Sequence, residues 1–410
     1  MNLKVIVVGA GITGVCTAEW LRRAGADVTL IDRVNPGDPA QTSYGNAGLL
    51  ARCAIIPVSV PGLTAKAPKM LLDPKSPLFM KWGYLPKLLP WLVPFLKNGR
   101  MDRLKPIVKA LDQLTHDSVD QHMALAKGTP AEKFIRTGDY IYVYKDRAAF
   151  EADGLGMGLR REHGFEIEEI NGAELHERDP HLSDAYNFGA NFPDHGWIGS
   201  PGKYVQALAR HFTDNGGTFL TGEVDKITNE GVRLKDGSGQ KADKIVVATG
   251  AWSKDMTRQL GDKINLETER GYHLFLKDPN FQPPVPYMIA DGKFAATPMD
   301  DGLRLAGTVE FGGLDAPASD APTDLLREHI KRVYPDLKWT IEEKWLGHRP
   351  STSDSLPVLS RSKNAPNVIY AFGSQHVGLT IGPRLGRMAM DMVMDVKTNT
   401  DLTPYRADRF

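Results

Sequence analysis

Three glycines near the amino terminus have the spacing that lets a polypeptide backbone approach a phosphate group. Gly9, Gly11 and Gly14 follow an apolar, β-branched run at residues 3–8 and precede a segment with helical spacing at residues 15–24. The first glycine would allow a tight turn, the second a close approach to a pyrophosphate, and the third close packing of helix against strand. The phosphate charge would then lie at the amino terminus of the helix.

An acidic residue completes this unit. A second strand is expected at residues 27–31 and ends in Asp32, near the spacing of roughly 20 residues at which a carboxylate binds ribose hydroxyls. The sequence therefore predicts one dinucleotide site, to which we also assign Ile12, Thr13 and Arg33. A nicotinamide-dependent dehydrogenase would continue with further βα repeats, whereas turn-forming residues follow at 35–40. That class is therefore disfavoured.

The composition is that of a globular protein of two or three domains, since 410 residues exceed the roughly 150 residues of one domain. The 50 basic residues equal the 50 acidic ones, so we expect no nucleic-acid partner. Cys16 and Cys53 cannot form a disulfide framework, and neither has the spacing of a metal ligand. No apolar run reaches the roughly 18 residues of a membrane span. We expect a reduced, cytoplasmic protein without a metal site.

Glycine-rich segments recur where later strands should end. Residues 42–49 are small, polar and glycine-rich, which would let a large planar ligand lie against the backbone. Apolar strands expected at residues 245–248 and 367–372 both lead into glycines, at Gly250 and Gly373. A glycine at the end of a strand permits close approach of a ligand to the backbone.

In this order, these segments resemble the D-amino acid oxidase superfamily of FAD-dependent oxidoreductases, most closely the small-chain bacterial D-amino acid dehydrogenases. The resemblance is carried by Gly9, Gly11 and Gly14 with Asp32, by residues 43–49, 246–252 and 373–380, and by Gly347-His348-Arg349-Pro350 with Asp354. It implies an α/β fold: a Rossmann-like FAD-binding domain with a parallel sheet and an interleaved α+β substrate domain with a mostly antiparallel sheet. The expected FAD-binding domain comprises residues 1–50, 190–260 and 340–410, and the substrate domain comprises residues 51–189 and 261–339.

The resemblance also implies FAD as the cofactor. Beyond the first glycine unit, it assigns to FAD the residues Ser43, Asn46, Ala47, Gly48, Leu49, Val224, Ala248, Gly250, Trp252, Gly373, His376, Val377, Gly378, Leu379 and Thr380. A helix that begins near Gly378 would stabilise the anion of a reduced flavin at its N1/O2 edge. Some relatives attach flavin through a His or Cys, and residues 43–49 contain neither. Noncovalent FAD is favoured, and attachment at His376 or Cys53 is the alternative.

The implied reaction is oxidation of an amino acid, with a D-amino acid as the first candidate. Hydride would pass from Cα to flavin N5, and the imine would hydrolyse to a 2-oxo acid. Arg349 matches the carboxylate-binding arginine of the family, because a guanidinium offers a planar fork for two oxygens; the alternative is an ion pair with Asp354. Tyr272 and His273 lie on a strand where relatives place substrate-facing side chains, and strand alternation allows only one of them to face the pocket.

Several alternatives stay open. Cyclic or N-alkyl amino acids such as D-proline, hydroxyproline or sarcosine are further candidate substrates. A different class of function, a non-catalytic FAD-binding module, is also an alternative. The electron acceptor would be oxygen or a quinone of a respiratory chain. Residues 85–97 are apolar with flanking lysines, and their prolines predict an interrupted helix. This segment would contact the inner face of a membrane, or pack on the substrate domain or another subunit of an oligomer.

Overall fold

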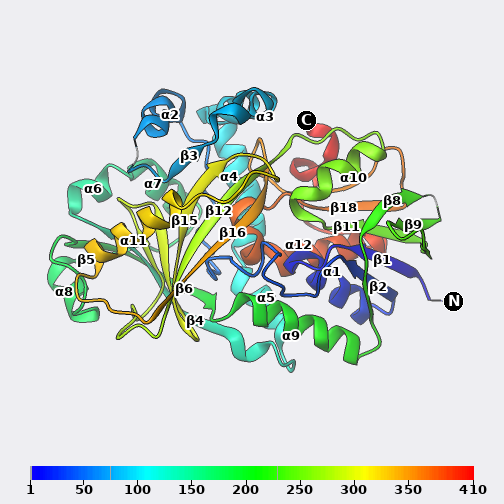
Figure 1. The fold of residues 1–410 in the computed structure, drawn as a ribbon, viewed down its shortest axis with the longest axis horizontal. Coiled ribbons are helices and arrows are strands. Elements are labelled where there is room, and N and C mark those ends of the chain that lie inside the picture. Colours follow the sequence, from blue (N-terminus) through cyan, green and yellow to red (C-terminus); the bar gives the residue numbers. More distant parts are fainter. Residues whose placement is uncertain (1, 74, 229) are drawn as a thin grey trace.

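The computed structural model describes residues 2–73, 75–228 and 230–410 and contains two large β-sheets side by side (Figure 1). Sheet A comprises, in spatial order, β17 (Val358–Arg361), β18 (Val368–Phe372), β11 (Lys244–Val247), β1 (Lys4–Val8), β2 (Asp27–Asp32) and β7 (Thr218–Thr221). All of its neighbouring strands are parallel except β17, which runs antiparallel to β18. The carboxyl ends of β1, β2, β11 and β18 therefore meet at one edge, where ligands of such sheets bind.

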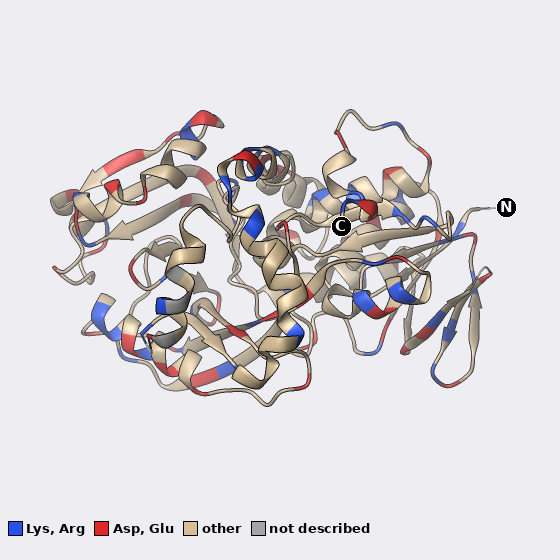
Figure 2. Ribbon diagram, turned by 90° about the horizontal axis from the view of Figure 1, so that it is seen from above, with Lys and Arg blue, Asp and Glu red and all other residues tan. Residues whose placement is uncertain are grey.

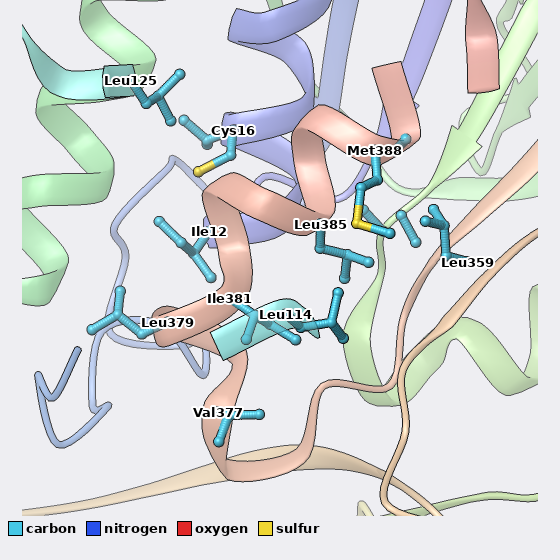
Figure 3. Close-up of a cluster of buried hydrophobic side chains, with 14 of the residues drawn as sticks. Ile12, Cys16, Leu114, Leu125, Leu359, Val377, Leu379, Ile381, Leu385 and Met388 are labelled. Carbon is cyan, nitrogen blue, oxygen red and sulfur yellow. The ribbon is translucent and has the colours of Figure 1, made fainter. Parts of the chain in front are cut away.

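Successive side chains of a strand point to opposite faces of a sheet, so the apolar strands of sheet A need cover on both faces. Helices cover one of these faces. The covering helices are α1 (Ile12–Arg23), α4 (Met101–Thr115), α5 (Ser118–Ala126), α9 (Pro201–Asp214) and α12 (Gly378–Val393). Figure 3 shows α12 packed against α1, with Ile12, Cys16, Leu385 and Met388 in the cluster between them. This packing fixes the amino termini of both helices at the same edge of the sheet.

The opposite face of sheet A is covered by α10 (Ser253–Gln259) and by a small antiparallel sheet. That small sheet comprises β8 (Val224–Thr228), β9 (Gly231–Leu234) and β10 (Gly239–Lys241). The three short strands lie between β7 and β11 in the chain, as expected for a β-meander that returns to a buried parallel strand.

Sheet B is mostly antiparallel. Its spatial order is β16 (Ile341–Thr352), β12 (Leu266–Lys277), β15 (Gly302–Phe311), β14 (Phe294–Met299), β13 (Tyr287–Ile289), β4 (Ile135–Tyr144), β6 (Phe188–Ile198) and β5 (Glu168–Asn171), with β3 (Leu78–Met80) beside β15. Helix α11 (Ala321–Val333) packs on its outer face. The peripheral helices are α2 (Leu63–Leu72), α3 (Leu85–Asn98), α6 (Arg147–Glu151), α7 (Gly154–Glu162) and α8 (Gly172–Arg178). The α/β fold class with two kinds of sheet, as predicted, is confirmed.

The pairing of strands places three segments differently from the expected division of the chain. β6 and β16 pair in sheet B, whereas the expected boundaries at 190 and 340 place most of β6 and all of β16 in the FAD-binding domain. The domain division itself stays a prediction. Helices α4 and α5, expected in the substrate domain, pack in the core of sheet A with α1 and α12. Local sequence does not fix these assignments, because an amphipathic helix or an alternating strand fits either core.

Residues 85–97 form one helix, α3, so the prediction of an interrupted helix is wrong. Pro86 lies in the first turn, where no N–H is needed, and Pro90 and Pro94 lie inside the helix. Each internal proline deprives the carbonyl four residues earlier of its partner, and Asn265 Nδ2 donates to the Pro90 carbonyl at 3.4 Å. Trp91 is buried and donates to the Ser351 carbonyl at 2.9 Å, so tertiary packing outweighs the helix-breaking residues.

One face of α3 thus packs on sheet B, and the opposite face exposes Leu89 and Val93. Membrane or subunit contact through this second face stays a prediction. Within residues 2–73, 75–228 and 230–410, the helices are too short or too polar to cross a bilayer. Figure 2 shows basic and acidic residues interspersed over both halves of the molecule.

A buried histidine in the core of sheet A should make stability fall in acid. His122 is fully buried, with Nδ1 2.8 Å from the Tyr204 hydroxyl and Nε2 2.9 Å from the Leu379 carbonyl. Burial lowers its pKa to about 4. Between this value and the unfolded-state pKa of about 6.5, the imidazole is protonated in the unfolded chain and neutral in the folded chain. The free energy of unfolding should therefore fall by about 1.4 kcal/mol for each unit by which the pH is lowered.

This contribution is complete above pH ~6.5 and is lost progressively towards pH ~4. We expect the thermal midpoint of the protein to drop less between pH 7 and pH 5 in His122→Gln than in the wild type. His181→Gln, at an exposed position, serves as the control and should follow the wild type. Equal drops in H122Q and the wild type would contradict the assignment.

Candidate active site

A cavity of about 360 Å³ lies at the carboxyl edge of sheet A. Its lining includes most of the residues predicted for the cofactor: Gly9, Gly11, Ile12, Thr13, Asp32, Arg33, Ser43, Asn46, Val224, Ala248, Gly250, Trp252, Gly373, Gly378 and Leu379. The other predicted residues lie outside this lining: Gly14, Ala47, Gly48, Leu49, His376, Val377 and Thr380. Six separate segments of the chain thus converge on one space.

The turn from β1 into α1 is closely packed against the neighbouring strand β11. Gly9 has a φ of +102°, and a Cβ there would lie 2.5 Å from the Ala248 carbonyl oxygen. A Cβ on Gly14 would overlap the Gly9 carbonyl oxygen. Gly14 therefore lets the first turn of α1 lie against the strand end and does not itself line the cavity.

Asp32 is held in place at the end of β2. Its Oδ2 accepts from the Ala10 backbone N–H at 2.7 Å and from Gln41 Nε2 at 3.0 Å. Gln41 also lines the cavity, and the sequence prediction missed it. Gln41 lies only two residues before Ser43, and this position could have indicated it. Its contact with Asp32, however, depends on the tertiary path of residues 35–41.

Further side chains fix the two sides of the cavity. Ser43 Oγ accepts from the Ile12 N–H at 2.9 Å, at the amino terminus of α1. The Arg33 guanidinium lies 4.0 Å from the centre of the Trp252 ring, a cation–π geometry. Trp252 lies in the 3₁₀ turn η3 (Gly250–Trp252) and contacts His348 edge to face. His348 belongs to β16, so sheet B reaches the cavity here.

A second contact joins β16 to the turn before α12. Ser351 forms a bridge with Ser374, and Gln375 Nε2 donates to the Thr352 carbonyl at 3.2 Å. Gln375 begins η4 (Gln375–Val377) and has a φ of +47°, an uncommon conformation for a side-chain-bearing residue. Both Ser374 and Gln375 line the cavity. The end of β16 that carries Arg349 is thereby fixed beside the carboxyl edge of sheet A.

Arg349 lies on the face of sheet B that is turned towards sheet A. It stands directly opposite Glu269 of β12, and this face also carries His273 and Trp345. Trp345 Nε1 donates to the Pro39 carbonyl at 2.7 Å, which ties the face to the dinucleotide-binding half. Burial lowers the pKa of Arg349, and the charge of Glu269 acts in the opposite direction.

His376 lies near the same guanidinium. Burial, with the positive charge of Arg349 as the second cause, lowers the pKa of its imidazole to about 4. A neutral imidazole therefore adjoins the guanidinium at neutral pH. The alternative partner proposed for Arg349, Asp354, instead binds Arg409 at 2.6 Å, so that alternative is wrong.

The two other predicted catalytic residues are engaged elsewhere. Tyr272 is buried on the outer face of sheet B, where its hydroxyl donates to Glu310 Oε2 at 2.8 Å and accepts from the Ser319 N–H at 3.0 Å. His273 lies on the inner face, but it stacks on Trp345 and its Nδ1 donates to the Gly45 carbonyl at 3.0 Å. Burial lowers the pKa of His273 well below its usual range. Their assignment to catalysis stays a prediction, and their present contacts support the packing of the strands.

A glycine beneath Arg349 gives a specific test of how the guanidinium is placed. A Cβ on Gly271 would lie 2.5 Å from Arg349 Nε and 2.6 Å from Cζ. Gly271→Ala should therefore displace the guanidinium and weaken binding of a carboxylate ligand by about 10-fold, the equivalent of one hydrogen bond. Titration with propanoate would measure this, with FAD affinity as the internal control. Unchanged propanoate binding would show that Arg349 does not bind the carboxylate from this position.

A parallel sheet with a glycine-rich turn, joined to a second sheet that carries an inward-facing arginine, is typical of a dinucleotide-dependent enzyme. Residues 4–392 match the model of the DAO family, FAD dependent oxidoreductase. The chain is 36% identical over 415 residues to the D-amino-acid oxidase of Bradyrhizobium diazoefficiens, covering 99% of this chain and 98% of that protein. The protein therefore belongs to the DAO family of FAD-dependent oxidoreductases.

Other comparisons agree with this family and fold. The chain is 27% identical over 423 residues to the D-amino acid dehydrogenase of the same organism, covering 100% of this chain and 99% of that protein. Among solved structures, L-proline dehydrogenase from P. horikoshii is similar in fold, with a TM-score of 0.74 and 17% identity over 100% of this chain and 98% of that chain.

The residues around the cavity fit FAD, the cofactor of this family. Close approach of a pyrophosphate is permitted because Gly11 leaves only the Ser43 hydroxyl near its Cβ position, and Gly250 faces open space. Asp32 lines the cavity, and the amino termini of α1 and α12 adjoin it. Binding of ribose hydroxyls by Asp32 stays a prediction. Cys53 lies outside the lining, is fully buried, and has its pKa raised by burial to about 11, which argues against a flavin bond through its sulfur.

Proposed function

We propose that this enzyme oxidises the Cα–N bond of an amino acid to an imine, which water hydrolyses to a 2-oxo acid, and that D-amino acids are its first candidate substrates. Bound FAD supplies the two-electron acceptor for the Cα hydrogen. The names of the two Bradyrhizobium relatives support an amino acid as substrate. The preference for D-amino acids rests on the names of these two relatives, both of which specify D-amino acids.

One observation carries the proposal. Arg349 lies on β16 opposite Glu269, with its guanidinium over Gly271 and within range of the charge of Glu269 and of His376. Within the described part of the chain its guanidinium forms no ion pair with a carboxylate. A substrate carboxylate can therefore bind both of its outer nitrogens. Such a clamp holds the substrate at a fixed orientation, and orientation supplies a large share of the rate enhancement.

The chain's other contacts support this task. The neutral His376 imidazole can exchange hydrogen bonds with the substrate without competing for its carboxylate. Covering of the cavity by sheet B would exclude water from the reacting carbon and strengthen the charged contacts. Noncovalent binding of FAD is part of this proposal, and the burial of Cys53 outside the cavity lining supports it.

The test is the visible spectrum of the purified protein with FAD. Under argon, a D-amino acid should bleach the flavin bands, and the matching L-amino acid should not. Faster bleaching by cyclic or N-alkyl amino acids would assign the substrate to that class. Flavin bands that no amino acid bleaches would contradict the proposal and favour a non-catalytic FAD-binding module. Reoxidation by oxygen or by a soluble quinone would then identify the acceptor.

A further inference from the structure

A second ionisable group on the inner face of sheet B, the Glu269 carboxyl, has one buried oxygen without a hydrogen bond in the described part of the chain. Glu269 lies on β12 directly opposite Arg349 and has only 3% of its surface exposed. Within the described residues, its buried Oε1 accepts no hydrogen bond. The neighbouring Ser351 hydroxyl and the Arg349 guanidinium lower the pKa of this carboxyl group, but the effect of burial is larger than both.

The direction of Arg349 explains why the two charges do not pair. Side chains opposite each other in antiparallel strands have Cβ atoms about 5 Å apart, near enough for an ion pair. The guanidinium instead extends over Gly271, two residues along β12 from Glu269. The guanidinium over Gly271 and the carboxyl group of Glu269 therefore lie apart on the same face and do not form an ion pair.

Other buried acids in this chain do have partners. Glu19 binds Arg22 at 2.8 Å and Arg23 at 2.6 Å, and Glu310 binds Arg270 at 3.0 Å. Glu267, two residues from Glu269 on the same strand, accepts from the Tyr84 hydroxyl at 2.9 Å. A buried carboxylate without such partners is costly. Burial accordingly raises the pKa of Glu269. Such a cost is typical of groups whose partner is a ligand.

We propose that Glu269 binds the amino group of the substrate whose carboxylate binds Arg349. This inference rests on the proposed function and names the second anchor of the same site. An amino acid carries an anionic carboxylate and a cationic ammonium on one carbon, so a guanidinium and a carboxylate on facing strands match both charges. Binding of the ammonium gives Glu269 Oε1 a hydrogen-bond donor and leaves the pair of sites electrically neutral. Glu269 thus distinguishes amino acids from other carboxylates.

Two ligands that cannot be oxidised separate this role from turnover. 2-Aminoisobutyrate lacks a hydrogen on Cα, and 2,2-dimethylpropanoate has a methyl group in place of its ammonium. Their dissociation constants can be measured by perturbation of the flavin spectrum in the FAD-loaded protein. We expect the wild type to prefer 2-aminoisobutyrate, and Glu269→Gln to lose about 10- to 100-fold of that preference, the range of a hydrogen bond to a charged group. Binding of 2,2-dimethylpropanoate should be unchanged in E269Q.

Glu267→Gln is the matched control, because it makes the same change at a buried glutamate that already has a partner. It should keep the wild-type ratio of the two dissociation constants. A wild type without preference for the ammonium ligand, or an E269Q variant that keeps the preference, would overturn the proposal. If E269Q changes the affinity for FAD and leaves the ligand ratio unchanged, Glu269 serves the cofactor and the proposal is again overturned.

Thermal stability gives a second, independent measurement. Removal of an unpartnered buried charge should raise the thermal midpoint of ligand-free E269Q by about 1–3 °C, whereas a structural carboxylate would lower it when replaced. Failure of the proposed function is distinguishable from failure of this inference. In the first case amino acids do not bleach the flavin although 2-aminoisobutyrate binds, and in the second case they bleach it equally in wild type and E269Q.

Discussion

Lysine in place of Arg349 should lower kcat/KM for an amino acid substrate by about 100- to 1000-fold, which is the cost of a lost partner in a largely desolvated charge pair. The charge is retained in this variant, but the planar fork that binds two oxygens is lost. The lysine side chain is also shorter than that of arginine, so its ammonium would not reach the position of the guanidinium over Gly271. Affinity for FAD should stay within about twofold of the wild type, since Arg349 lies outside the cavity lining.

Stopped-flow reduction of the flavin by the best amino acid found would measure this effect. Arg136→Lys is a suitable control, because Arg136 is 43% exposed and binds Asp300 away from the cavity. It should react like the wild type. An R349K variant with wild-type kcat/KM would exclude Arg349 as the carboxylate anchor and would remove the main support for the proposed function.

Alanine in place of Gly14 should abolish tight binding of FAD. The added Cβ would overlap the Gly9 carbonyl oxygen and lie 2.9 Å from the Gly9 carbonyl carbon. Both atoms are backbone, so no side-chain rotation relieves the contact, and α1 must move away from the end of β1. Such overpacking costs about 1–3 kcal/mol of stability, and we expect the affinity for FAD to fall by about 100-fold, because the phosphate-binding turn shifts with the helix.

Titration of apoprotein with FAD, followed by quenching of flavin fluorescence, would measure the loss. Gly158→Ala is the matched control. Gly158 also lies in a helix, α7, but no atom lies within 4 Å of its Cβ position. G158A should bind FAD normally and gain up to about 1 kcal/mol from the better helix propensity of alanine. Wild-type FAD affinity in G14A would show that the turn does not depend on this close packing.

The sequence alone determined the dinucleotide-binding unit, because its signals are local. Gly9, Gly11, Gly14 and Asp32 lie within one strand–helix–strand unit, whose geometry follows from neighbouring residues. The FAD-dependent family was also predictable, since its motifs recur in a fixed order along the chain and the comparisons confirm it. The α/β fold class followed from the same pattern.

Tertiary structure decided which side chains meet. Strand alternation predicted that Tyr272 and His273 lie on opposite faces of β12. Only the packing of sheet B shows that Tyr272 is on the outer face and that His273 is hydrogen-bonded to the Gly45 carbonyl. The prolines of α3 predicted a break that the packing of Trp91 prevents. In each case a contact with a distant segment outweighs a local preference.

The positions of Glu269 and Arg349 on facing strands are the clearest case of this division. In the chain, β13, β14, β15 and α11 lie between the strands of these two residues. Glu269 and Arg349 are opposite each other only because β12 and β16 pair in one register. A shift by one residue would place them on opposite faces. Residue types and local periodicity predict which chemistry a segment can offer, whereas strand register and packing between sheets decide which groups share a site, because those contacts form between residues far apart in the chain.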